Sequence, residues 1–220
     1  LSINLSKRVC YLLFVICFYL NLILKDLIML LPNPKAVEFL LSRRSRPAKT
    51  LVGPGPTDEE LKILLRAAAR TPDHGKLEPW RFIVFQGDAL SRLVNLIVKR
   101  GTELELEPEK INKTCTALKT GAVMIAVVSS PKQSNKIPEM EQILSSGAVC
   151  LSLLNAALAS GWGANWLTDW ISTDKEFLKQ GIDLTDSEFV AGYIHIGAES
   201  IIPPERPRPN MEEITSWVNN

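Results

Sequence analysis

Two short segments of this chain combine the side chains that a binding site for an anionic, flat ligand requires. The first is Arg43-Arg44-Ser45, and the second runs from Arg70 to His74. Guanidinium groups can form paired hydrogen bonds with phosphate oxygens, or donate to the carbonyl groups of an electron-poor ring. Hydroxyl and imidazole groups add further donors. We therefore expect the two segments to act on one anionic, flat ligand.

The local sequence predicts that a helix ends just before each segment. Residues 35–42 are amphipathic and place the two arginines at a helix end. Residues 57–60 read Thr-Asp-Glu-Glu, which is a capping box and predicts a second helix N-terminus. Pro72 ends that helix, because the residue before a proline is disfavoured in the α region. His74 is therefore expected on a rigid turn just past a helix end.

The rest of the chain alternates between apolar strands and helices. Residues 141–160 predict a long helix that is apolar nearly all round, as expected in a core or a dimer interface. Residues 103–113 are charged and irregular, and we expect a surface excursion there. Strands are predicted over residues 81–86, 122–128, 165–170 and 189–197. This pattern favours a mixed α and β fold without specifying its topology.

The ordered set of motifs resembles the nitroreductase family of FMN-dependent oxidoreductases. The motifs cover residues 35–197, in the family's order and at close to its spacing, so the set is specific although each motif alone is weak. They are Arg43-Arg44-Ser45, Pro56-Thr57, residues 64–74, Pro79-Trp80, Lys136-Ile137-Pro138 with Glu141-Gln142, Ser146-Gly147-Ala148, and Gly161-Trp162-Gly163 with Trp166.

The resemblance implies three groups of contacts with FMN. They are Arg43, Arg44 and Ser45 at the phosphate and ribityl regions, Arg70 and His74 from the other subunit, and a strip of Trp166, Leu167 and Thr168. In the family an arginine and a serine follow the tryptophan of this strip. Here Leu167 and Thr168 follow it, so a hydroxyl is kept and a cation is lost. Flavin affinity or reduction potential is therefore expected to differ.

The resemblance also assigns one stretch to the nicotinamide nucleotide. It consists of Ala156, Ala157, Leu158, Ala159, Ser160 and Gly161, and helix packing explains these small residues as well. The sequence does not choose between NADH and NADPH, because no acidic residue or arginine stands in a recognisable ribose-reading position. No catalytic side chain is expected, because the isoalloxazine ring itself accepts and donates the hydride.

The implied fold is an α+β, three-layer sandwich, in which helices flank a mainly antiparallel sheet. The long helix is expected at the interface of a homodimer with FMN shared between the subunits, so that monomers would be inactive. The implied activity is hydride transfer from NAD(P)H to an electron-poor small molecule, nitroaromatic or quinone, by a ping-pong mechanism. The physiological acceptor is left open.

Two other functions are compatible with the residues. One is a flavin-binding or membrane-tethered module that no longer turns over substrate and acts as a sensor or storage protein; Leu167 and the apolar N-terminus motivate it. The other is a flavin-free interaction domain, in which Arg43, Arg44 and Arg70 would be ordinary surface charges. The ordered context of these arginines disfavours the second of these.

Composition excludes several function classes. The net charge of the 220 residues is +1 with both signs interspersed, so we expect no nucleic-acid partner. The length suits one domain with one core. The four cysteines, Cys10, Cys17, Cys115 and Cys150, lack zinc-type spacing and are expected to be reduced, buried thiols rather than metal ligands.

Residues 1–31 form an apolar extension before the FMN-binding domain, which we assign to residues 32–220. Residues 9–24 form an almost unbroken apolar run, which is shorter than the ~20 residues that a membrane span usually needs. A signal peptide is disfavoured because no small-residue cleavage site follows. We expect upstream sequence that is not native, with a membrane anchor as the alternative. The protein is therefore expected in the cytoplasm, with membrane association only if this segment is native.

Overall fold

A computed structural model describes residues 31–219 of the chain. It divides into two compact units, Leu1–Ser42 and Arg43–Asn220. The described part of the first unit contains helix α2 (Pro34–Ser42), as the amphipathic pattern predicts. The apolar extension lies outside the described residues except for Leu31. The fold and the site below belong to the second unit.

An antiparallel sheet forms the centre of the second unit. Its strand order is β1-β5-β3-β2, and β4 pairs with β5 along Tyr193–Gly197, next to the short β1 pairing at Ala198 and Glu199. Every described pairing is antiparallel. The strands are β1 (Leu51–Val52), β2 (Trp80–Gln86), β3 (Val123–Ser129), β4 (Gly163–Leu167) and β5 (Phe189–Glu199).

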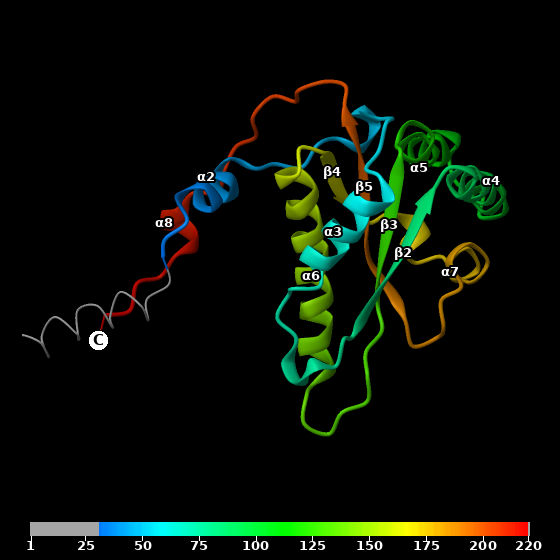
Figure 1. Ribbon diagram of the computed structural model, residues 1–220. Coiled ribbons are helices and arrows are strands. Elements are labelled where there is room, and N and C mark those ends of the chain that lie inside the picture. Colours follow the sequence, from blue (N-terminus) through cyan, green and yellow to red (C-terminus); the bar gives the residue numbers. More distant parts are fainter. Residues whose placement is uncertain (1–30, 220) are drawn as a thin grey trace, which may run out of the picture. The chain divides into compact units, whose positions relative to one another are not determined.

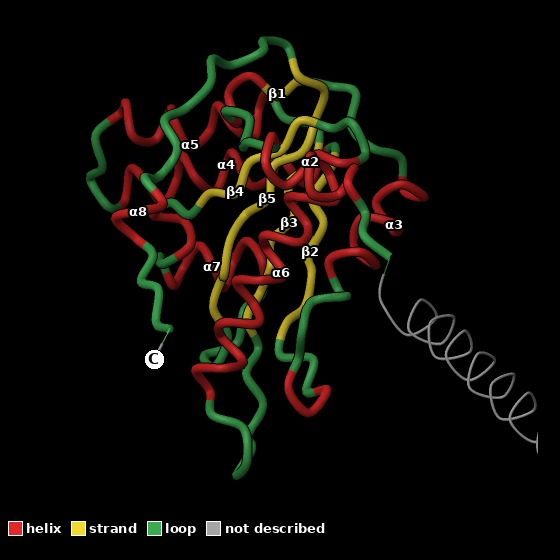
Figure 2. The backbone as a smooth tube through the Cα atoms, turned by 90° about the vertical axis from the view of Figure 1, so that its left-hand side faces the viewer, coloured by secondary structure: helices red, strands yellow, loops and turns green. Residues whose placement is uncertain are grey.

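Helices cover both faces of this sheet, as Figures 1 and 2 show. Helices α3 (Asp58–Ala68) and α6 (Glu139–Ala159) lie on one face, and α4 (Asp88–Glu103), α5 (Pro108–Thr120) and α7 (Lys175–Ile182) lie on the other. The remaining described elements are η1 (Ala48–Thr50), η2 (His74–Lys76), η3 (Trp170–Ser172) and α8 (Met211–Ile214). The predicted three-layer α+β sandwich is confirmed.

Strand β3 explains why both faces need a helical layer. All its residues are buried, and successive side chains of a strand point to opposite faces. The odd-numbered residues from Val123 to Val127 join the core beneath α3 and α6, whereas the even-numbered residues from Met124 to Val128 join the core beneath α4, α5 and α7.

The expectation of an irregular excursion over residues 103–113 is wrong. Helix α4 continues to Glu103 and α5 begins at Pro108, with only a short turn between them. Proline suits the first turn of a helix, because the N–H that it lacks would have no partner there. The helix was missed because most of its surface is polar or charged and only one face is buried. The buried residues are Thr114, Cys115, Ala117 and Leu118.

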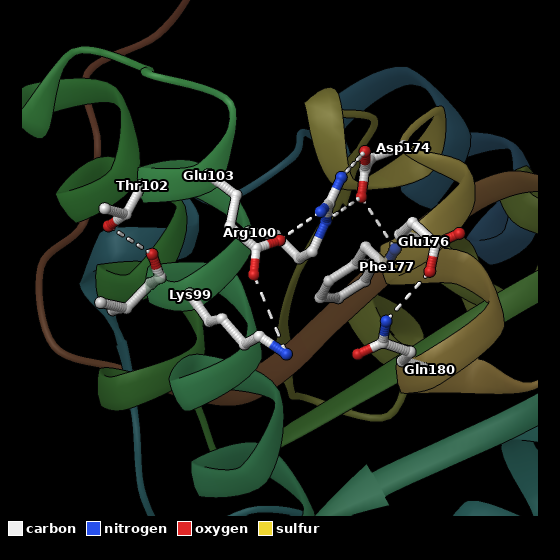
Figure 3. A network of polar contacts seen from close by, with 9 residues as sticks. Lys99, Arg100, Thr102, Glu103, Asp174, Glu176, Phe177 and Gln180 are labelled. Carbon is white, nitrogen blue, oxygen red and sulfur yellow. Dashed lines mark hydrogen bonds and ion pairs between the residues drawn. The ribbon is translucent and has the colours of Figure 1, made fainter.

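An ionic network ties α4 to α7 (Figure 3). The Arg100 guanidinium donates from Nε and Nη2 to the two carboxylate oxygens of Asp174, at 3.0 and 2.9 Å, and it also pairs with Glu103. Asp174 Oδ1 accepts from the backbone N–H of Phe177 as the N-cap of α7. These hydrogen bonds from Arg100 lower the pKa of Asp174. The network fixes the outer helical layer.

A second ion pair predicts how stability depends on pH. Arg81 donates to both carboxylate oxygens of Glu188 at 2.7 and 2.8 Å, and these hydrogen bonds lower the pKa of the Glu188 carboxyl to about 2. A lower pKa in the folded state stabilises the fold above about pH 4.5, and this stabilisation is lost as the pH falls towards about 2.

We therefore expect Glu188→Gln to lower the free energy of unfolding at pH 7 by roughly 2 kcal/mol. Its difference from the wild type should shrink as the pH falls from 4.5. Urea unfolding at several pH values measures this, with the exposed Glu109 changed to glutamine as the control. A pH-independent difference would contradict the prediction.

Candidate functional site

The segment that carries the first arginine cluster is fastened to the edge of the sheet. The backbone N–H of Arg46 donates to the carbonyl of Ala164 at 2.8 Å, and the Asn165 amide donates to the carbonyl of Arg46 at 2.6 Å. The Arg46 guanidinium also pairs with Glu199 at 3.4 Å. Arg43, Arg44 and Ser45 therefore lie immediately before a segment that is held against β4.

These arginines have buried donors that no described residue satisfies. Nε of Arg43 and both Nε and Nη1 of Arg44 are inaccessible to solvent and have no hydrogen-bond partner within the described residues. The one contact within the cluster is long, from Arg43 Nη2 to Ser45 Oγ at 3.4 Å. Buried polar groups are normally hydrogen-bonded, so these three unpaired guanidinium nitrogens make the cluster a candidate site for an anion.

The C-terminal tail adds a cation that the sequence pattern did not reveal. Burial and the positive charge of Arg208 both lower the pKa of Arg43, so Arg208 lies near the cluster. Arg208 also pairs with Glu205 at 2.8 Å, and Glu205 is near Arg44 as well. The Glu205 carboxylate thus lies near both Arg44 and Arg208. The only sequence signal was an arginine-rich stretch between prolines at residues 203–209.

The second cluster lies on a turn that α6 holds in place. The carboxylate of Asp73 accepts from the backbone N–H groups of Leu77 and Glu78 at 3.2 and 2.7 Å, which closes the turn. Two serines of α6 fix its flanks, because Ser145 donates to the carbonyl of Pro72 at 2.8 Å and Ser152 bonds the Thr71 hydroxyl at 2.9 Å. The predicted rigid turn is confirmed.

The imidazole of His74 is oriented by a carboxylate. Its Nδ1 lies 2.7 Å from Oε2 of Glu141, in the first turn of α6. A hydrogen bond at one ring nitrogen fixes the ring and leaves Nε2 for a ligand. The side chain is 62% exposed, so much of the ring is accessible. Arg70 is exposed and forms no ion pair among the described residues.

Within one chain, the first cluster and His74 are far apart. Glu141, which holds His74, is near the N-terminal end of α6. Strand β4, against which the first cluster is held, begins just after the C-terminal end of this helix (Figure 1). From Glu141 to Ala159 the helix extends roughly 27 Å at its usual rise per residue. One chain therefore does not bring His74 to the first cluster.

The third group, in contrast, lies close to the first. The indole of Trp166 packs over Gly192, where a Cβ atom would lie 2.0 Å from Nε1, and this nitrogen donates to the carbonyl of Ala191 at 3.3 Å. Leu167 and Thr168 follow at the exposed end of β4. Trp166 thus anchors the strand, and the two residues after it are free to contact a ligand.

Comparison with known proteins decides the family. Residues 40–198 match the model of the family described as "Nitroreductase family". The chain belongs to the nitroreductase family. It is 32% identical over 164 residues to "Putative NAD(P)H nitroreductase" of Haemophilus influenzae, an alignment that covers 74% of this chain and 87% of that protein.

Two further proteins illustrate the likeness. "Putative NAD(P)H nitroreductase YdjA" of Escherichia coli K12 is 28% identical over 166 residues, which are 76% of this chain and 89% of that protein. The crystal structure of FMN and NADPH-dependent nitroreductase NfnB from Sphigopyxis sp. strain HMH is 17% identical, with a TM-score of 0.64, over 84% of this chain and 99% of that one. At this identity the NfnB structure shows the shared fold alone.

In this nitroreductase-family chain, the stretch considered for the nicotinamide nucleotide forms the C-terminal end of α6 and the turn after it. Ala157 is fully buried beneath the sheet, and Ala156 and Leu158 are partly buried. Ala159, Ser160 and Gly161 are exposed, and Gly161 has a φ of +85°, which suits glycine after a helix. Packing therefore explains the buried members, and the last three are accessible to a ligand.

Several other reactive side chains of this nitroreductase-family chain belong to the core. Burial raises the pKa of Cys150 to about 12, and it also raises the pKa of Cys115, so both described cysteines are protonated, buried thiols as predicted. Cys10 and Cys17 lie outside the described residues. Within residues 31–219 no group of three or more His, Cys, Asp or Glu side chains is arranged for a metal ion.

Helix α6 is also the one described helix that is apolar and long enough to span a bilayer. However, 44% of its most apolar window is buried inside the protein. A core helix of a folded protein has the same composition, so this helix is weak evidence for a membrane span.

Proposed function

We propose that this protein is an FMN-dependent oxidoreductase that takes a hydride from NAD(P)H and reduces a nitroaromatic or quinone acceptor in a ping-pong cycle. Its membership of the nitroreductase family supports this proposal, as do the cofactors named for NfnB. The observation that carries it is the set of buried, unpartnered guanidinium nitrogens of Arg43 and Arg44. Bound FMN would supply the hydride chemistry.

The first cluster has the donor set that a phosphate monoester requires. Arg43 and Arg44 would donate to the phosphate oxygens, and the Ser45 hydroxyl would donate to the phosphate or the ribityl chain. Arg208, which lies near Arg43, would add a further positive charge. Charge-assisted hydrogen bonds from arginine are among the stronger polar contacts in proteins, so this cluster would contribute much of the affinity for FMN.

The strip at the end of β4 would position the flavin ring. Trp166 is fixed by its contact with Gly192, and it holds the following backbone in one extended path. Leu167 offers an apolar surface to an aromatic ring, and the Thr168 hydroxyl can donate to a ring carbonyl. Because the strip replaces water on one side of the ring, the opposite side would receive NAD(P)H and then the acceptor.

A homodimer would complete the site from the second copy of the chain. An apolar stripe runs along the outward face of α6, at Met140, Leu144 and Leu151, whose side chains are 63%, 65% and 45% exposed. Between them lies Gly147, where a Cβ atom would meet nothing within 4 Å. A second copy of this helix can therefore approach closely.

An antiparallel pairing of the two α6 helices would bring the separated clusters together. Such pairing sets the N-terminal end of one helix beside the C-terminal end of the other. His74 and Arg70 of the partner subunit would then approach Arg44 across the interface. This arrangement overcomes the separation of roughly 27 Å within one chain, and it makes FMN binding depend on dimerisation.

We further propose that residues 32–220 are the FMN-binding domain and that the protein acts in the cytoplasm. NAD(P)H, the electron donor in this reaction, is a soluble small molecule. Residues 1–31 are either a membrane anchor or sequence that is not native, and the protein would associate with a membrane only in the first case.

An absorbance spectrum of the full-length protein, recorded before and after anaerobic addition of NADPH or NADH, tests the proposed function. We expect flavin bands that bleach when the reductant is added. A protein that binds FMN but is not reduced would support the sensor or storage alternative, which Leu167 motivates. A colourless protein that takes up no added FMN would overturn the proposal.

A further prediction concerns the orientation of His74. Glu141→Gln replaces the carboxylate with an amide that can still hydrogen-bond the ring but holds no charge. We expect the dissociation constant of FMN to rise roughly fivefold, because the imidazole is less firmly oriented. Fluorescence titration with FMN measures this, with Glu139→Gln in the same helical turn as the control. An unchanged constant would mean that Glu141 does not orient a flavin contact.

A further inference from the structure

A pocket opens between α5, the end of β4 and β5. Its volume is about 260 Å³, and its apolar lining includes Ala117, Leu118, Leu167 and Ile171. The exposed side chains of Lys110 and Lys113 also line it, from the first half of α5. The pocket therefore combines apolar walls with two cations, which suits a molecule that has a hydrophobic body and an anionic group.

The pocket's one carboxylate, Asp169, is bonded to neutral donors and forms no ion pair with either lysine. Asp169 accepts from the backbone N–H of Trp170 at 2.7 Å and from the Thr114 hydroxyl. That hydroxyl in turn accepts from the Trp170 indole at 3.1 Å. Neither lysine forms an ion pair within 4.0 Å in the part of the chain that the structure describes.

The two titratable groups in the floor of the pocket are uncharged at neutral pH. Burial lowers the pKa of His195 to about 4, although a hydrogen bond with the backbone of Ala117 opposes the shift. The Tyr193 hydroxyl donates to the carbonyl of Ile171 at 3.1 Å, and burial raises its pKa. Of the groups that line the pocket, only the two lysines and Asp169 are charged, so the lining keeps a net positive charge.

We propose that this pocket binds the anionic group of a small-molecule substrate, with Lys110 and Lys113 pairing a carboxylate or phosphate. The pocket contains Leu167 and Thr168, the two residues that we propose to lie along the flavin ring. The inference therefore rests on the proposed function, and it adds that one of the two substrates carries a negative charge which this pocket recognises.

The anionic group has two sources in this reaction. An acceptor such as a nitrobenzoate carries a carboxylate on an aromatic ring, whereas NADPH carries a 2′-phosphate that NADH lacks. Both would use the same two cations. Substrate pairs that differ mainly in the charged group therefore distinguish them, namely 4-nitrobenzoate against 4-nitrobenzyl alcohol, and NADPH against NADH.

The test is the double variant Lys110→Gln with Lys113→Gln in the full-length, FMN-loaded protein. Lys119→Gln is the matched control, because this lysine is exposed on the same helix and does not line the pocket. If the acceptor supplies the anion, KM for 4-nitrobenzoate should rise about tenfold while KM for the alcohol stays unchanged. If NADPH supplies it, KM for NADPH should rise by a similar factor relative to NADH.

A binding measurement separates this inference from the proposed function. Calorimetric titration of the oxidised protein with 4-nitrobenzoate, and with adenosine 2′-phosphate, needs no turnover. Weaker binding of either compound in the double variant would support the anion pocket even if NAD(P)H failed to bleach the flavin. Equal binding of both compounds and equal KM ratios in the wild type and the double variant would overturn the proposed anion site, even if the flavin bleaches normally.

Discussion

Replacing Arg43 and Arg44 together with alanine is expected to leave a folded protein that has lost its flavin. The buried Nε atoms of both residues, and Nη1 of Arg44, have no described partner, so the fold gains no hydrogen bonds from them. A phosphate would provide those partners. Hydrogen bonds to charged groups contribute about 1.5–3 kcal/mol each, so the loss of two arginines should weaken FMN binding at least a hundredfold.

Flavin absorbance per protein chain and fluorescence titration with FMN measure this effect. Arg66→Ala, at an exposed position of α3, is the matched control, and its flavin content should stay at the wild-type level. The thermal unfolding temperature of the flavin-free double variant should equal that of the flavin-free wild type or exceed it, because unpaired buried charge is removed. A double variant that retains one FMN per chain would refute the assignment of the phosphate site.

Introducing a charge into the apolar stripe of α6 is expected to abolish both the dimer and flavin binding. In Leu144→Glu, two copies of the helix would each bury a carboxylate against apolar side chains, without a cation to pair with it. Sedimentation should then show monomers at concentrations where the wild type is dimeric. Because the site would need His74 from the second subunit, FMN content should fall with the dimer.

The control is Val98→Glu, which places the same charge at another exposed apolar position, on α4 across the sheet. It should remain a dimer with FMN bound. Co-expression gives a second readout, because chains with Arg43→Ala and Arg44→Ala can pair with chains that carry His74→Ala. A shared site predicts one intact site in such a mixed dimer and hence recovered flavin. A wild-type monomer with full FMN content would contradict the shared site.

Local sequence determined much of the site's framework. Thr57 and Glu60 form the predicted capping box, in which each side chain accepts from the backbone N–H of the other residue. The long apolar helix was predicted over residues 141–160 and is observed at Glu139–Ala159. These features depend on neighbours within a few positions of the chain, so a single sequence contains the information that specifies them.

Periodicity failed where a helix is charged on most of its surface. Helix α5 looked irregular because its lysines and glutamate are as many as the residues of its one buried face. Its apolar face became recognisable only against the sheet and α4. The pocket with Lys110 and Lys113 was missed for the same reason, because its other wall comes from β4 and β5, more than fifty residues later.

By itself, then, the sequence determined the α+β class, the helix boundaries around the arginines and the turn that carries His74, together with the residues that resemble a flavin site. Only the tertiary structure decided which of them meet. Hydrogen bonds between Arg46 and β4 hold the segment of the first arginines against this strand, whereas the length of α6 separates it from His74. Caps and turns are fixed by adjacent residues. The distances between the groups of site residues depend instead on packing between segments that are far apart in the chain, and a local sequence pattern does not predict such packing.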